Sequence, residues 1–170
     1  MSWRGSNTIQ DKIFACLTYL VPLVEVLRFG AFLFALLPPL AVLFSPLFFL
    51  LPIYGSYWGL VALAIFFGLY FGVVRNQSLS YFLRFHTMQA LLLGIFAWLC
   101  EYLLQLFGLS QQLVFGGFPT ANDPMELLVA IVSSAIFIFV VGGSIYSIFQ
   151  ALRGETAKIP IISDAANSQV

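Results

Sequence analysis

Long apolar runs alternate along this chain with short polar or proline-rich stretches. No charged residue lies between Arg28 and Arg75, a stretch too long for one membrane crossing at about 20 residues per helix. Its first half contains prolines, which remove backbone donors and interrupt helices: Pro38, Pro39, Pro46 and Pro52. Residues 56–74 are then apolar almost throughout, and the polar residues 75–78 follow them. The pattern predicts a membrane-spanning helix over residues 56–74.

Three further spans are needed to accommodate the remaining apolar runs. Two of them are predicted at residues 81–107 and 125–152, and the Gly, Pro and Asn residues between them are typical of a surface loop. The first span has two candidates. Residues 12–28 have about the minimum length for a crossing, whereas residues 29–51 are longer but contain three prolines. The pattern alone leaves both candidates open.

The composition indicates whether this chain folds in water or in a lipid bilayer. Of its 170 residues 61% are hydrophobic and 8% are charged, whereas about a quarter of the residues in a soluble domain are charged. The length suits a single bundle of a few spanning helices and leaves no room for a separate soluble catalytic domain. We therefore predict an all-α polytopic membrane protein that forms one integral membrane domain, residues 1–170, in a lipid bilayer.

The loop charges predict how the helices are oriented, because Lys and Arg concentrate on the cytoplasm-like side of a membrane. The loop at residues 108–124 contains no cation. Cations instead precede the first span, lie between the second and third, and follow the last: Arg4, Lys12, Arg75, Arg84, Arg153 and Lys158. An even number of spans places all these segments on one side. We predict a four-transmembrane-helix bundle with both termini on the cytoplasmic or stromal side, whichever candidate is the first span.

Small residues spaced four apart predict where helices pack closely. Two such pairs lie in and before the span at residues 56–74, on opposite helix faces, and two more lie in the last span. The predicted packing pairs are Gly55 with Gly59, Gly68 with Gly72, Ala130 with Ser134, and Gly143 with Ser147. We interpret them as contacts of a compact bundle rather than as the lining of a substrate path.

Polar residues gather on one face of the third predicted span, which contains the only histidine of the chain. A helix that begins near Tyr81 brings His86, Gln89 and Glu101 within about 120° of one another, together with small side chains. Arg84 lies in its first turn. This candidate polar face, Arg84, His86, Gln89 and Glu101, needs partners inside a membrane. We expect His86 and Gln89 to bond to another helix or to the loop at residues 75–80, and contact with a translocating substrate is the alternative.

The sequence shows no catalytic constellation. Ser133 and Ser134 lie in the middle of a span without a neighbouring base, and no Gly-rich phosphate loop follows a strand. Cys16 and Cys100 lie inside apolar runs, as packed thiols do. Seven basic and seven acidic residues leave no basic patch for nucleic acid. We expect no enzyme activity, no cofactor, no metal site and no nucleic-acid partner.

Four segments are distributed, in this order, along nearly the whole chain from Asp11: "DKIFACLTYLVPL" (11–23), "LYFGVVRN" (69–76), "RFHTMQALLL" (84–93) and "IPIISDAANSQV" (159–170). Together they resemble the Tic-twenty family, the twenty-kilodalton membrane component of the chloroplast inner-envelope protein translocon, which has cyanobacterial relatives. The resemblance implies four spanning helices with both ends in the stroma or cytoplasm. It favours residues 12–28 as the first span, with residues 29–54 interfacial or re-entrant, and residues 154–170 form a polar C-terminal tail.

The resemblance also implies a function. The protein is expected to belong to a channel for precursor proteins, with other translocon subunits, a translocating precursor polypeptide and further copies of itself as partners. The alternative is a small-solute permease or an accessory subunit of a cyanobacterial membrane complex. The expected location is the plastid inner envelope in a plastid-bearing host, and otherwise a cyanobacterial plasma or thylakoid membrane. Residues 1–12 show no signal or transit pattern, so in an organelle we expect a protein that is encoded there or lacks its targeting piece.

Overall fold

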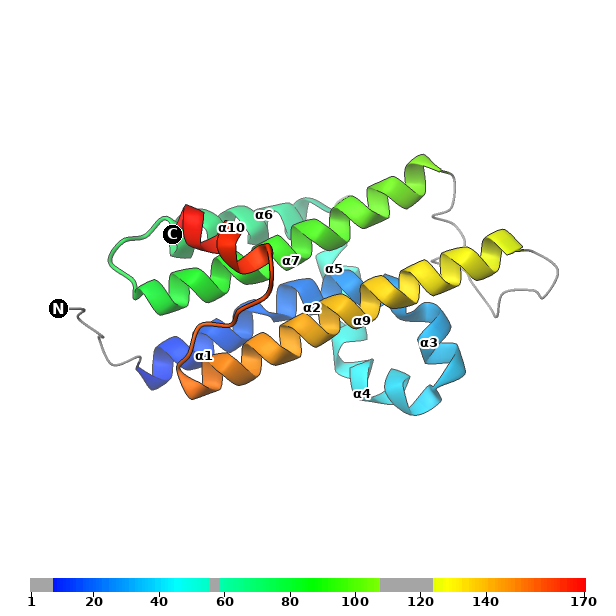
Figure 1. Ribbon diagram of the computed structural model, residues 1–170, viewed down its shortest axis with the longest axis horizontal. Coiled ribbons are helices and arrows are strands. Elements are labelled where there is room, and N and C mark those ends of the chain that lie inside the picture. Colours follow the sequence, from blue (N-terminus) through cyan, green and yellow to red (C-terminus); the bar gives the residue numbers. More distant parts are fainter. Residues whose placement is uncertain (1–7, 56–58, 108–123) are drawn as a thin grey trace.

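The computed structural model describes residues 8–55, 59–107 and 124–170 (Figure 1). These residues form helices and connecting segments without a strand, which confirms the predicted all-α class. Three of the described helices are long and apolar enough to cross a membrane: Ile9–Leu36, Tyr81–Leu106 and Pro124–Arg153. Two shorter apolar helices, Pro38–Phe48 and Leu60–Val74, lie between the first and second of them. A fourth crossing stays a prediction.

The first long helix is a continuous segment with a local break. Its parts are α1 (Ile9–Thr18), α2 (Leu20–Val26), the 3-10 turn η1 (Leu27–Gly30) and α3 (Ala31–Leu36). Thr8 and Asp11 form a capping box at its start. Pro22 has no N–H to donate to the carbonyl of Thr18, so the helical ladder is interrupted beside Tyr19. The structure thus joins the first candidate span to the beginning of the second.

Prolines shape the segment that follows. Leu37 adopts a non-helical conformation because it precedes Pro38, and α3 ends there. Helix α4 (Pro38–Phe48) begins with two prolines, where a missing N–H costs nothing, and α5 (Leu51–Tyr54) has a proline in its first turn. As the sequence predicts, no uninterrupted helix covers residues 37–53.

Helix α6 (Leu60–Leu69) continues into η3 (Tyr70–Val74), one turn of π-helix. Together they are about 22 Å long, less than the roughly 30 Å hydrocarbon core of a bilayer. The neighbouring α7 (Tyr81–Leu106) has 26 residues and a length of about 39 Å. Figure 1 shows α6 lying along α7 and beginning well short of the end of α7. Part of α7 therefore has no α6 beside it.

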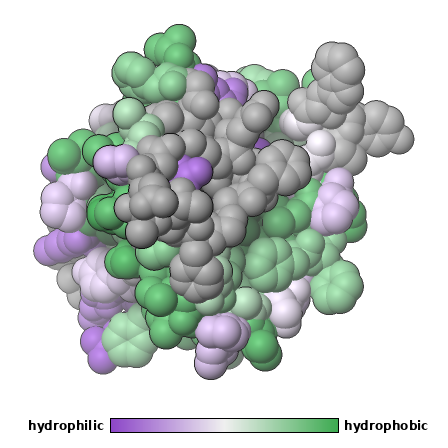
Figure 2. Space-filling model, turned by 90° about the vertical axis from the view of Figure 1, so that its right-hand side faces the viewer, coloured by the Kyte–Doolittle hydropathy of each residue, from purple (hydrophilic) through white to green (hydrophobic). Residues whose placement is uncertain are grey.

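Helix α7 lies at the centre of the bundle. It packs against α1, α2, η3, α9 (Pro124–Arg153) and α10 (Ile162–Gln169). The largest buried cluster joins the first helix, α4, α7 and α9: Leu23, Val26, Leu27, Phe29, Phe44, Ala97, Leu104, Val129, Phe137 and Val140. Outside this core, large hydrophobic side chains are exposed, and many of them are visible in the end view of Figure 2. An exposed apolar surface of this kind suits contact with lipid.

Two of the predicted packing pairs need correction. A Cβ atom built on Gly68 or Gly72 meets no atom within 4 Å, so neither glycine lies at a contact with the described part of the chain. The reason is that α6 and η3 turn larger side chains toward α7, among them Phe66 and Tyr70. Gly59 has no neighbour within 4 Å either, and its φ of +83° makes it the left-handed residue before α6.

Close approaches occur at other small residues. Helix α9 is tight at Gly143, where an added Cβ would lie 3.4 Å from Ile159 and 3.6 Å from Leu93. Ser147 on the next turn is fully buried, whereas the Ser134 hydroxyl donates to the Ala130 carbonyl of its own helix at 2.7 Å. An added Cβ on Gly55 would lie 3.3 Å from the Leu51 carbonyl oxygen of its own turn and 3.7 Å from Nη2 of Arg28 in η1.

The tightest glycine is one that the sequence did not single out. A Cβ on Gly30 would lie 2.6 Å from the ring of Phe34 and 2.7 Å from the ring of Phe137. Phe137 belongs to α9 and is buried, and its ring also packs against Phe44 of α4. Gly30 is therefore the glycine that lets the first helix approach α9.

Candidate functional site

The polar face of α7 is buried against the break in the first helix. His86, Gln89 and Tyr19 are all fully buried. The Tyr19 hydroxyl lies 2.9 Å from His86 Nδ1 and 3.0 Å from Gln89 Oε1, two acceptors that share its single hydrogen. One of the two predicted partners, another helix, is therefore present, because the interruption beside Tyr19 places a phenol opposite α7.

The second partner is the C-terminal segment rather than the loop at residues 75–80. His86 Nε2 lies 3.0 Å from the Glu155 carbonyl oxygen, and because a carbonyl only accepts, Nε2 carries the hydrogen. Gln89 Nε2 donates to Ser163 Oγ at 3.1 Å. The Ser163 hydroxyl in turn donates to the Ala157 carbonyl and accepts from the Ile159 N–H. These bonds attach residues 154–170, here called the C-terminal clasp, to α7.

The clasp continues along the first turns of α7. Arg84 donates through Nε to the Val74 carbonyl and through Nη2 to the Val170 carbonyl, both at 2.8 Å. Residues 154–170 are predicted from the sequence only as a polar tail, yet Ala157 and Ala166 are fully buried. The apolar residues Ala157, Ile159 and Ala166 within this polar segment are the sequence feature that indicates packing against the bundle. Figure 1 shows α10 lying across α6 and α7.

Glu101 does not join this network. It lies about 18 Å further along α7 than Gln89 and forms an ion pair with Arg28 of η1, with 2.7 Å between Arg28 Nη1 and Glu101 Oε1. The predicted polar face is thus divided into a buried network near the start of α7 and a charged pair near its end.

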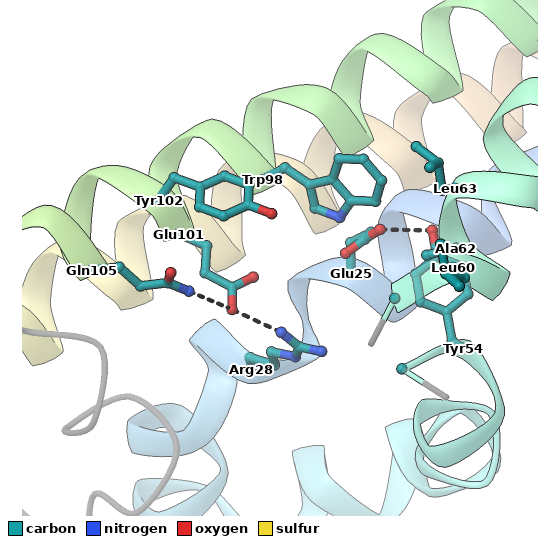
Figure 3. Close-up of a pocket in the computed structure, with 12 residues that line it drawn as sticks. Glu25, Arg28, Tyr54, Leu60, Ala62, Leu63, Trp98, Glu101, Tyr102 and Gln105 are labelled. Carbon is teal, nitrogen blue, oxygen red and sulfur yellow. Dashed lines mark hydrogen bonds and ion pairs between the residues drawn. The ribbon is translucent and has the colours of Figure 1, made fainter. Parts of the chain in front are cut away.

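The charged pair lies on a polar cavity of about 440 Å³ (Figure 3). The cavity lies between the start of α6 and the last turns of α7. Its walls come from α2, η1, α5, the start of α6 and α7: Glu25, Arg28, Tyr54, Gly55, Gly59, Leu60, Ala62, Leu63, Trp98, Glu101, Tyr102 and Gln105. A cavity with charged walls inside an apolar bundle is a candidate binding or transport site.

Glu25 is the most buried charged residue of this cavity, with 6% of its surface exposed. The Tyr54 hydroxyl donates to Glu25 Oε1 at 2.6 Å, and Figure 3 shows the Trp98 indole directed toward the same carboxyl group. Across the cavity the Gln105 amide reaches Glu101 Oε1 at 3.4 Å. In the sequence, Glu25 and Arg28 are two charges within the candidate span at residues 12–28. Their pairing with residues of α5 and α7 depends on contacts between segments far apart in the chain.

Comparison with known proteins assigns the family. The model of the family described as "Chloroplast import apparatus Tic20-like" matches residues 10–166, nearly the whole chain. The chain belongs to this Tic20 family. The match includes Tyr19, His86, Gln89 and Ser163 of the buried network and every residue of the polar cavity. The buried network and the polar cavity therefore both lie within the residues that the family model matches.

Similar proteins come from a cyanobacterium and from a plant. A Tic20 family protein of Synechocystis is 36% identical over 95% of this chain and 93% of its own length. Protein TIC 20-II, chloroplastic, of Arabidopsis thaliana is 34% identical over 94% of this chain and 72% of its own. Protein TIC 20-v, chloroplastic, of the same plant is 28% identical over 98% of this chain. With its apolar helices, this Tic20 protein is an integral membrane protein.

Proposed function

We propose that this Tic20 protein is a membrane component of a protein-conducting translocon, in the plastid inner envelope or in the corresponding cyanobacterial membrane. The names of its chloroplast relatives and the family description support a role in protein import. The structural observation that carries the proposal is the polar cavity between α2, α6 and α7. Backbone N–H and C=O groups of a crossing polypeptide find no partners in lipid, so a polypeptide needs a polar path of this kind.

The proposed topology has four crossings: the first long helix, α6 with η3, α7 and α9. Two observations support it. Lys12 Nζ donates to the Leu152 carbonyl, so the start of α1 lies beside the end of α9, and Figure 1 shows both at one end of the bundle. The cationic segments at residues 75–84 and 153–158 lie at that same end. We place this end on the stromal or cytoplasmic side.

A conduit requires more than one of these chains. The cavity of about 440 Å³ has the size of a small-molecule site rather than of a path across the membrane, so other subunits or further copies would complete a path. The exposed apolar surface of α6 and α9 gives them an area to pack against. No step of this function calls for catalysis by the chain itself.

Cross-linking to a precursor polypeptide tests the proposal. A photoreactive residue at Leu63, which lines the cavity, is compared with one at Ile138, an exposed residue of α9 that does not line it. A precursor arrested during translocation should form an adduct with the Leu63 variant and little or none with the Ile138 variant. The absence of adducts at Leu63, with the precursor shown to be arrested, would contradict the proposal. Solute flux through the purified protein under those conditions would favour the permease alternative.

A further inference from the structure

We propose that the polar cavity binds one organic cation, an ammonium or guanidinium group, between the carboxyl group of Glu25 and the rings of Trp98 and Tyr102. This inference goes beyond the proposed function and stands without it. Its basis is the balance of charges, the aromatic walls and the accessibility of the cavity.

The charges of the cavity are unequal among its described residues. Its walls carry two carboxyl groups, Glu25 and Glu101, and one cation, Arg28. Arg28 forms its short ion pair with Glu101, whereas Glu25 accepts a hydrogen bond from the neutral hydroxyl of Tyr54. Enclosing a carboxylate without a cation of its own is costly, and a cation that enters the cavity offsets this cost. The same imbalance disfavours an anionic ligand.

The walls also suit a cation rather than a neutral polar molecule. The rings of Tyr54, Trp98 and Tyr102 surround the space beside Glu25 (Figure 3). Aromatic faces attract ammonium and guanidinium groups through their quadrupoles, and indole does so most strongly. A carboxyl group with several aromatic rings therefore offers an organic cation one charged contact and several weaker ones. Among the described residues no three His, Cys, Asp or Glu side chains are grouped so that they could hold a metal ion.

The cavity is accessible and has an adequate size. The Arg28 side chain at its edge is 40% exposed, whereas the Glu101 side chain is 18% exposed. Its volume of about 440 Å³ lies within the range of roughly 300–1,000 Å³ that small-molecule sites occupy. Gly55 and Gly59 contribute walls without side chains, so an alkyl chain attached to the cation has space. The cation can thus belong to a basic side chain of a polypeptide, an amine headgroup of a lipid or a free amine.

Binding is measured with butylguanidinium, and the uncharged butylurea of nearly the same shape serves as the matched ligand. The full chain is reconstituted in nanodiscs of neutral galactolipid, which carries no amine. In a background with Trp3→Phe and Trp58→Phe, Trp98 is the sole tryptophan and reports binding through its fluorescence. We expect saturable binding of butylguanidinium and at least tenfold weaker binding of butylurea.

Glu25→Gln removes the charge and keeps an oxygen that accepts from Tyr54. We expect it to weaken butylguanidinium binding at least tenfold. Glu126→Gln is the matched control, because Glu126 lies at the start of α9 and does not line the cavity. It should leave the affinity unchanged. Equal affinities of the Glu25→Gln variant and the unmutated chain would overturn the proposal.

Two further arms complete the test. If Glu25→Gln does not fold, the ligand pair still decides the matter on the native sequence by thermal shift: butylguanidinium should raise Tm and butylurea should not. Equal shifts overturn the proposal. The source of the cation is then identified by competition, with an arginine-containing peptide against its citrulline counterpart, and with phosphatidylethanolamine added to the nanodiscs. A competitor that displaces butylguanidinium supports the site, and failure of every amine and guanidinium competitor overturns it. Precursor cross-linking is independent of these results.

Discussion

Replacing Tyr19 by Phe removes one oxygen atom. It should destabilise the bundle more than Gln89→Leu, although Gln89→Leu is the larger change of side chain. The hydroxyl contacts His86 Nδ1 and Gln89 Oε1, and both side chains are fully buried. Its loss leaves two enclosed polar atoms without this partner. Each such atom costs about 1–3 kcal/mol in protein interiors, so the expected loss of unfolding free energy is at least about 2 kcal/mol.

Gln89→Leu provides the comparison. It removes three contacts, to Tyr19, to Ser163 and to the Ala157 carbonyl, but each of these partners keeps another hydrogen bond. Tyr19 keeps His86, and the Ser163 hydroxyl keeps the Ala157 carbonyl and the Ile159 N–H. Hydrogen bonds between membrane helices are worth about 0.6 kcal/mol each on average, so this variant should lose no more than about 2 kcal/mol, the lower limit expected for Tyr19→Phe.

The measurement is reversible unfolding of the purified protein in mixed micelles, with increasing dodecyl sulfate and helix content as the signal. Tyr102→Phe serves as the control, because Tyr102 is 65% exposed, and it should change the unfolding free energy little. The reasoning fails if Tyr19→Phe matches this control, or if Gln89→Leu is the more destabilising variant. Altered transport by Tyr19→Phe with unchanged stability would instead assign the network a direct role in transport.

Two further predictions concern packing and topology. Gly30→Ala should lower the unfolding free energy, because the buried ring of Phe137 must move, whereas Gly68→Ala should not lower it in the isolated chain; equal losses in the same unfolding assay would contradict the packing described here. Single cysteines at Gln77, Asn122 and Ser168, in a chain without Cys16 and Cys100, test the topology with an impermeant thiol reagent. Only Asn122 should react from the side opposite the cytoplasm or stroma, and reaction of Ser168 from that side would exclude four crossings.

The hydrophobic pattern by itself determined much of this protein. In lipid, backbone N–H and C=O groups find no water to bond to, and an α-helix pairs them all within one segment. Long apolar runs therefore predict an all-α membrane protein without knowledge of tertiary contacts. Proline acts locally, through its missing N–H and its effect on the preceding residue, and the end of α3 and the start of α4 follow from that. The periodicity of α7 likewise placed His86 and Gln89 on one face, and a buried polar face needs partners.

Tertiary structure decided which partners these are. Nothing in the local sequence connects Gln89 with Ser163, 74 positions away, because the contact depends on how the clasp folds back. Packing by small residues failed as a signal at Gly68 for a similar reason: spacing shows that a helix can approach closely, and only the opposing surface shows whether it does. The same holds for Gly30, whose neighbour Phe137 lies on another helix. The polar cavity likewise depends on tertiary structure, because its walls come from α2, η1, α5, α6 and α7, and the sequence of no single helix contains it.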